Sequence, residues 1–136
     1  MFDEKDPILH RVRALCMVLP GAAEKVSHGR PCFYTKKIFL TYGVTLKGDH
    51  EGGRKDHAIA FLPDPAERAA LEQDERFFVP AYSGAFGWMA MDLSTDDVDW
   101  GEVGELIEES FRQTAPPKLC EQLNSTERPS PAKRRR

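Results

Sequence analysis

The sequence predicts a two-layer α+β domain: an antiparallel five-stranded sheet with helices on one face, in the order α-β-β-β-α-β-β-α. Segments with the periodicity of amphipathic helices occur near both ends and in the middle of the chain. Between them lie short runs rich in β-branched and aromatic residues, close enough in sequence to pair as hairpins. Sequential hairpins favour an antiparallel sheet, and the helices then pack on one face of it.

The first helix is predicted from Pro7 to about Leu19. Asp6 is a good N-cap, and proline suits the first helical position. An apolar stripe at helical spacing follows, made of Ile8, Val12, Leu15 and Leu19. Pro20 and Gly21 end the helix, because proline disfavours helical backbone in the preceding residue and glycine permits a free turn.

Three strands are predicted next, at residues 32–35, 38–42 and 57–62. Lys36 and Lys37 form the tight turn between the first two strands. Residues 43–56 contain four glycines and charges of both signs, so we expect a long hairpin loop there; the alternative is that residues 44–46 prolong the preceding strand.

Two further helices and two strands complete the domain. Asp64 and Asp99 are predicted N-caps, each followed three residues later by the glutamate of a capping box. The predicted helices run over 65–73 and 100–115, and the predicted strands over 77–79 and 88–93. The chain therefore divides into one domain, residues 1–120, and a basic tail, residues 121–136, whose Ser, Pro and Arg content predicts disorder.

Charge is unevenly distributed along the sequence. Residues 128–136 hold five of the 19 bases and no acid, which leaves 14 bases against 22 acids, a net charge of −8, in residues 1–127. Residues 92–109 hold eight acids and no base, whereas residues 25–55 hold seven bases and two acids. The domain should therefore have an acidic side and a basic side.

Cysteine usage and hydropathy indicate a cytoplasmic protein. Three widely spaced cysteines, Cys16, Cys32 and Cys120, suggest no disulfide framework. The N-terminal residues lack the basic and apolar regions of a secretory signal, and no apolar run approaches the roughly 20 residues that cross a bilayer. We expect a monomer without membrane contact.

An ordered set of short motifs resembles the MmcQ/YjbR family from about residue 8 to residue 120. The motifs are Arg13, Cys16, Leu19-Pro20-Gly21-Ala22, His28-Gly29-Arg30-Pro31-Cys32-Phe33, Tyr82, Gly87-Trp88, Asp92-Leu93, Asp99-Trp100, Glu102-Val103, Ser110-Phe111-Arg112 and Ala115-Pro116-Pro117-Lys118-Leu119. The resemblance implies a YjbR-like α+β fold of double-wing type. The family name also carries a prediction of DNA binding. The loop 43–56 is longer than the family's usual hairpin.

A basic hairpin is the candidate nucleic-acid-binding surface. Neutralising phosphate requires lysine or arginine, and the candidates are Arg30, Lys36, Lys37, Arg54 and Lys55. Phe33 and Tyr34 lie among them as candidate stacking groups. The alternative is that these are solvated loop charges and that the two rings belong to the core.

A second set of residues is a candidate pocket: His28, Tyr82, Gly84, Gly87 and Trp88. Glycines let a backbone approach a ligand closely, but the spacing matches neither a phosphate-binding loop nor a dinucleotide motif. His28, Cys32, His50 and His57 do not have the spacing of a zinc site. We therefore expect no cofactor, no metal and no catalytic constellation.

Two functions of different class follow. The first is a non-catalytic module that binds DNA weakly and with little sequence preference through the basic hairpin. The second is a protein-interaction or small-ligand-binding domain that uses the sheet face or the acidic last helix and has no nucleic-acid role. The basic hairpin favours the first, and the net charge of −8 on residues 1–127 favours the second.

Overall fold

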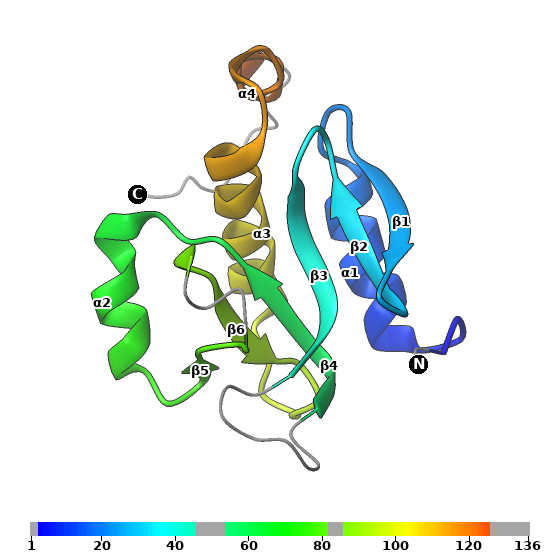
Figure 1. Cartoon of the computed structure of the whole chain (residues 1–136), viewed down its shortest axis with the longest axis vertical. Helices are drawn as coiled ribbons and strands as arrows, with labels where there is room; N and C mark the ends of the chain where they lie inside the picture. The colour runs from blue at the N-terminus through cyan, green and yellow to red at the C-terminus, as the bar shows by residue number, and fades with distance from the viewer. Residues whose placement is uncertain (1–2, 46–53, 82–85, 126–136) are drawn as a thin grey trace.

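Six strands form one sheet in the order β1-β2-β3-β4-β6-β5, and every neighbouring pair is antiparallel (Figure 1). The computed structural model describes residues 3–45, 54–81 and 86–125. The strands are β1 (Ala23–Ser27), β2 (Arg30–Tyr34), β3 (Ile38–Thr45), β4 (Arg54–Phe61), β5 (Phe77–Phe78) and β6 (Met89–Asp92).

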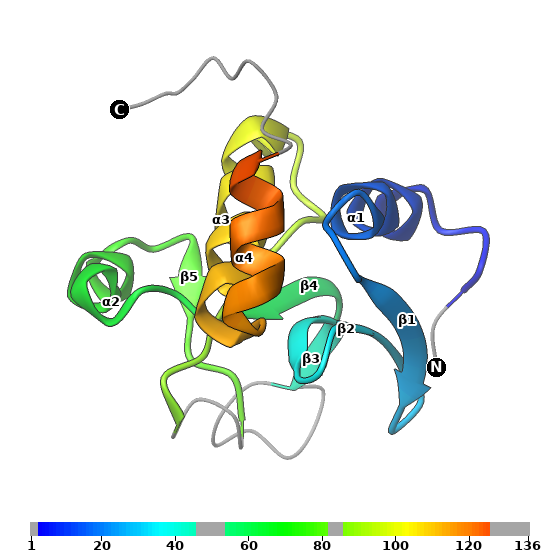
Figure 2. The ribbon, with the colours of Figure 1, turned by 90° about the horizontal axis from the view of Figure 1, so that it is seen from above.

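The helices form the second layer. They are α1 (Pro7–Met17), α2 (Pro65–Gln73), α3 (Trp100–Thr114) and α4 (Pro117–Ser125). Figure 2 shows α1 and α3 on one side of the sheet, α2 beside β5, and α4 across the C-terminal end of α3. The predicted two-layer α+β class is confirmed. Among the described helices, none has the length and apolar character to cross a membrane.

The three predicted N-caps are confirmed. The carboxylate of Asp6 accepts a hydrogen bond from the amide of Ile8, and that of Asp64 accepts one from the amide of Ala66. Asp99 accepts from the amides of Gly101 and Glu102. Aspartate at these positions satisfies amides that have no partner within the helix.

The core lies between the sheet and the two helices that cover it. Its largest fully buried side chains include Phe33, Phe39, Tyr42, Phe61 and Phe111. One polar residue, Ser110 of α3, is completely buried among them. Its hydroxyl donates to the carbonyl of Phe39 and accepts from the amide of Leu62 at 2.8 Å. Ser110 thus joins α3 to the beginning of β3 and to the residue that follows β4.

The sheet differs from the prediction by one strand. β1 was expected to be a polar turn, because Ala23–Ser27 shows no clear alternation of apolar and polar residues. It is an edge strand, and its Val26 side chain is 58% exposed. The expected loop 43–56 is also shorter, since β3 continues to Thr45 and β4 begins at Arg54.

The predicted end of the domain at residue 120 is corrected by α4. Pro116 and Pro117 were expected to end the helical part, but Pro117 begins a new helix, a position that proline suits. Leu123 is buried in the core, so the disorder expected from residue 121 is wrong for residues 121–125. Residues 126–136 lie outside the described residues.

The contact between α4 and the end of α1 is close. Gly21, just after α1, has a φ of +74°. A Cβ atom there would lie 2.9 Å from Cδ1 of Leu119. Glycine is therefore required both by the backbone and by the packing of Leu119.

Candidate nucleic-acid interface

The sheet face opposite the helices, called here the outer face, carries one base on β1 and one on β2, and two more bases lie in the β2–β3 turn. Residues 23–45 contain one acid, Glu24, and four bases. The bases are Lys25, Arg30, Lys36 and Lys37. Because successive side chains in a strand point to opposite faces, Glu24 lies on the helix side. There Arg13 of α1 donates to its carboxylate at 2.8 and 2.9 Å. Along residues 23–45, the outer face therefore carries bases without an acid.

Arg30 is fixed on this face by β3. Its guanidinium donates a 2.9 Å hydrogen bond to the carbonyl of Gly43. Gly43 has a φ of +91°, and a Cβ atom there would lie 3.4 Å from Cδ of Arg30. The glycine thus lets the arginine side chain lie across the strand.

Tyr34 is the half-buried aromatic ring of the same face. The ammonium of Lys25 lies 4.8 Å from the centre of its ring, in a cation–π contact. The other aromatic rings of residues 23–45, those of Phe33, Phe39 and Tyr42, are buried in the core. The exposed pair Lys36 and Lys37 follows Tyr34 at the β2–β3 turn.

The structure separates the five predicted bases into two places. Lys36 and Lys37 lie at the β2–β3 turn, whereas Arg30 and Lys55 lie toward the other end of the sheet (Figure 1). The Lys55 ammonium is 3.9 Å from the carboxylate of Asp92. Arg54 begins β4, but its side chain lies outside what the structure describes. Lys25 was missed, because only the unpredicted β1 brings it beside Tyr34.

The predicted pocket does not form from its described members. His28 is exposed in the β1–β2 turn, whereas Trp88 precedes β6 on the far side of β3 and β4. Trp88 packs against a small apolar cluster of the sheet, made of Val44, Ala58, Ala60 and Ala90. Gly87 has the positive φ expected of a glycine turn. Tyr82 and Gly84 lie outside the described residues.

A pocket of about 310 Å³ lies instead beside β5 and β6. Its walls combine Phe78 and Met91 with charged side chains of both signs. The charged residues are Lys55, Glu75, Arg76, Asp92 and Asp97. No motif in the sequence marks this pocket, because its residues come from three separate stretches of the chain.

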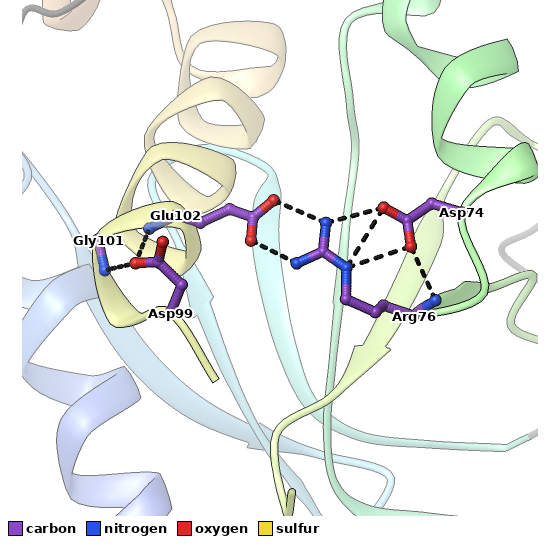
Figure 3. Close-up of polar contacts among 5 residues, drawn as sticks. All are labelled: Asp74, Arg76, Asp99, Gly101 and Glu102. Atoms are coloured by element: carbon purple, nitrogen blue, oxygen red, sulfur yellow. Dashed lines mark hydrogen bonds and ion pairs between the residues drawn. The ribbon is translucent and has the colours of Figure 1, made fainter. Parts of the chain in front are cut away.

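Arg76, in the wall of this pocket, joins the end of α2 to the start of α3 (Figure 3). Its guanidinium donates to Asp74 at 2.8 Å and to Glu102 at 2.7 and 3.1 Å. The carboxylate of Glu102, which was predicted to complete a capping box, thus accepts hydrogen bonds from Arg76. Hydrogen bonds from the side chain and the backbone of Arg76 lower the pKa of Asp74 to about 2.

This shift gives a direct test of the Arg76 bridge. In an NMR titration, the Asp74 carboxyl should titrate near pH 2. In the variant Arg76→Gln, its pKa should rise toward the ordinary aspartate value of about 3.9. The variant Arg112→Gln, which removes an arginine paired with Glu108 on α3, is the matched control and should leave the pKa of Asp74 unchanged. An Asp74 pKa that is equal in the parent chain and in Arg76→Gln would contradict the bridge.

A buried polar cluster joins the start of α1 to the sheet. Asp6 is 7% exposed, and Tyr42 is 1% exposed. One carboxylate oxygen of Asp6 caps α1. The other accepts a hydrogen bond from the Tyr42 hydroxyl and lies 2.8 Å from Nδ1 of His57. The pocket beside β5 does not include His57, and we assign the cluster a structural role.

The pKa values of the cluster follow from its contacts. Burial alone would raise the pKa of Asp6, but hydrogen bonds from Tyr42 and the α1 amides, with the charge of His57, outweigh it and lower the pKa. Burial and the hydrogen bond to Asp6 raise the pKa of Tyr42. The cluster therefore holds a carboxylate and a neutral phenol.

The described residues offer little chemistry for a metal or a thiol nucleophile. Burial raises the pKa of Cys16 and Cys32, which disfavours the reactive thiolate. Across the described ranges, no group of three or more His, Cys, Asp or Glu side chains could hold a metal ion.

The sheet and the helices that cover it make up an α+β domain. Its family is identified by its sequence. The sequence model of the YjbR family matches residues 17–113. Since the match spans most of the chain, the protein belongs to the YjbR family.

One solved structure shows the same fold. Deinococcus radiodurans protein DR2400, which carries the family-model domain DUF419, aligns with a TM-score of 0.58. The alignment covers 85% of this chain and 87% of that chain at 17% sequence identity. No curated protein matches this sequence.

Proposed function

We propose that this protein is a non-catalytic nucleic-acid-binding module that uses the outer face of β1–β3. The observation that carries the proposal is the charge of residues 23–45: four bases and a single acid, which Arg13 holds on the helix side. Such a face can neutralise phosphates without repelling them. It offers few groups suited to reading base edges, so binding should tolerate sequence changes.

The spacing of the bases suits an extended polyanion. Arg30 begins β2 and Tyr34 ends it, about 13 Å apart at roughly 3.3 Å per residue, and Lys36 follows in the turn just beyond. A single nucleic-acid strand presents several phosphates over that length. The four glutamates of α3 belong to a helix that covers the opposite face of the sheet (Figure 2), so they lie away from the outer face of β1–β3.

Charge reversal at the turn tests the proposal. The five bases of residues 128–136 are first changed to glutamine, so that binding reports the domain alone. This tail-neutralised chain should bind a labelled, mixed-sequence 20-base-pair duplex, as measured by fluorescence anisotropy. With four phosphate contacts, the logarithm of the binding constant should fall with the logarithm of the salt concentration with a slope of about −3.6. Adding Lys36→Glu and Lys37→Glu should weaken binding about tenfold on every sequence and flatten the slope by about 1.8.

A matched control separates the face from overall charge. The pair Lys5→Glu and Lys118→Glu makes the same charge change at exposed residues of the helix layer. It should weaken binding much less. If both pairs weaken binding equally, or if the tail-neutralised chain does not bind at low salt, the outer face is not a nucleic-acid interface.

A small-ligand-binding domain is the second candidate, and the pocket beside β5 and β6 favours it. The pocket combines apolar surface from Phe78 and Met91 with side chains of both charges. A ligand there should protect against thermal unfolding, and its effect should disappear in the variant Phe78→Ala. A screen in which no small molecule raises the melting temperature would count against this candidate.

A further inference from the structure

The position of Tyr34 in the basic face bears on the kind of nucleic acid that the face accepts. This inference rests on the proposed function and concerns the same surface. Tyr34 ends β2 on the outer face, four residues after Arg30 and two before Lys36. Groups that bind phosphate therefore lie on both sides of one aromatic ring.

One face of the Tyr34 ring is covered by a charged side chain of the neighbouring strand. The Lys25 ammonium lies over the ring, 4.8 Å from its centre. Because the lysine side chain is flexible, it can move aside and leave this ring face to a flat partner such as a base. Lys25 would then have a phosphate as its new partner.

Stacking distinguishes single strands from duplexes. In a duplex the base faces are covered by neighbouring base pairs, so a half-buried ring such as Tyr34 finds no uncovered base on which to stack. In a single strand a base can turn outward and stack on an aromatic ring, whatever its identity.

We propose that the outer face of β1–β3 binds single-stranded nucleic acid, with one base stacked on Tyr34 in place of the Lys25 ammonium. Arg30, already held against β3 by Gly43, contacts the phosphate on one side of that base. Lys36 and Lys37 contact the phosphates on the other side.

The experiment compares one tail-neutralised chain on two ligands. Fluorescence anisotropy at low salt measures binding of a 12-nucleotide oligo(dT) and of a 12-base-pair duplex. Tyr34→Ala should weaken oligo(dT) binding about tenfold, the usual effect of losing one stacked base. It should change duplex binding less than about twofold. Tyr34→Phe keeps the ring and should bind oligo(dT) like the parent chain.

The stacking contact can also be tested by changing the ligand, so that the result does not depend on the folding of a variant. An oligo(dT) in which every base is removed, leaving the sugars and phosphates, should bind the parent chain about tenfold more weakly than intact oligo(dT). To the Tyr34→Ala chain, both ligands should bind alike. Circular dichroism and the melting temperature of each variant confirm that the fold is retained.

The possible outcomes separate the two proposals. In one outcome, Tyr34→Ala weakens the binding of single strand and duplex equally, or changes neither, while the pair Lys36→Glu and Lys37→Glu weakens the binding of both. The face then binds phosphate, but Tyr34 does not stack on a base. The single-strand inference is then wrong and the proposed function stands. If the lysine pair has no effect on either ligand, the proposed function fails as well.

Discussion

Replacing Ser110 by alanine is expected to lower the free energy of unfolding by about 3 kcal/mol. The hydroxyl is fully buried and is the partner of two backbone groups, the carbonyl of Phe39 and the amide of Leu62. Alanine leaves both without a partner, and each buried, unsatisfied group costs roughly 1–3 kcal/mol. Urea unfolding at neutral pH, followed by circular dichroism, measures the change.

Ser94→Ala is the matched control for this prediction. Ser94 is exposed in the connection between β6 and α3, and its substitution should change the free energy of unfolding by less than about 0.5 kcal/mol. A loss below about 1 kcal/mol in Ser110→Ala would mean that the hydroxyl is not the link between α3 and the sheet.

Replacing Asp6 by alanine should also cost about 3 kcal/mol, because it removes an N-cap and a buried hydrogen-bond acceptor together. The cap of α1 is lost, and the Tyr42 hydroxyl is left buried without its carboxylate partner. Asp6→Asn keeps a good capping residue and a neutral oxygen, so its loss should be smaller. Equal losses in the two variants would contradict the contribution of the cap and of the acceptor oxygen.

The contribution of Asp6 should depend on pH. Its pKa is lower in the folded protein than in the unfolded chain, so its stabilisation is complete above the unfolded value of about 3.9. That stabilisation is lost as the pH falls through the folded pKa. The difference in unfolding free energy between the parent chain and Asp6→Asn should therefore shrink from pH 6 to pH 2. A constant difference over that range would contradict the lowered pKa.

The local part of the fold could be predicted from the sequence, since its signals lie within a few residues. Asp6, Asp64 and Asp99 cap helices whose starts were correctly predicted. β1 was missed because an edge strand with partly exposed side chains needs no regular apolar pattern. α4 was missed because the sequence alone does not distinguish a proline that begins a helix from a proline that follows the end of one.

The site was harder to predict, because it depends on pairing between strands. Lys55 was predicted to share a surface with Arg30 and Lys36 because the three are close in sequence. In the structure, β4 places Lys55 beside Asp92. Lys25 joins Tyr34 only through the register of β1 on β2. The second oxygen of Asp6 and the hydroxyl of Ser110 find their partners 36 and 71 residues away in the chain, beyond the reach of any local pattern.

The packing of Leu119 against Gly21 also has a consequence for folding during synthesis. The two residues are separated by nearly the whole domain, so α1 leaves the ribosome long before α4 exists. Until then, the end of α1 and the core position of Leu123 stay uncovered. We expect the nascent domain to remain open to chaperones until α4 emerges, and the closure of α4 onto α1 to be a late step of folding.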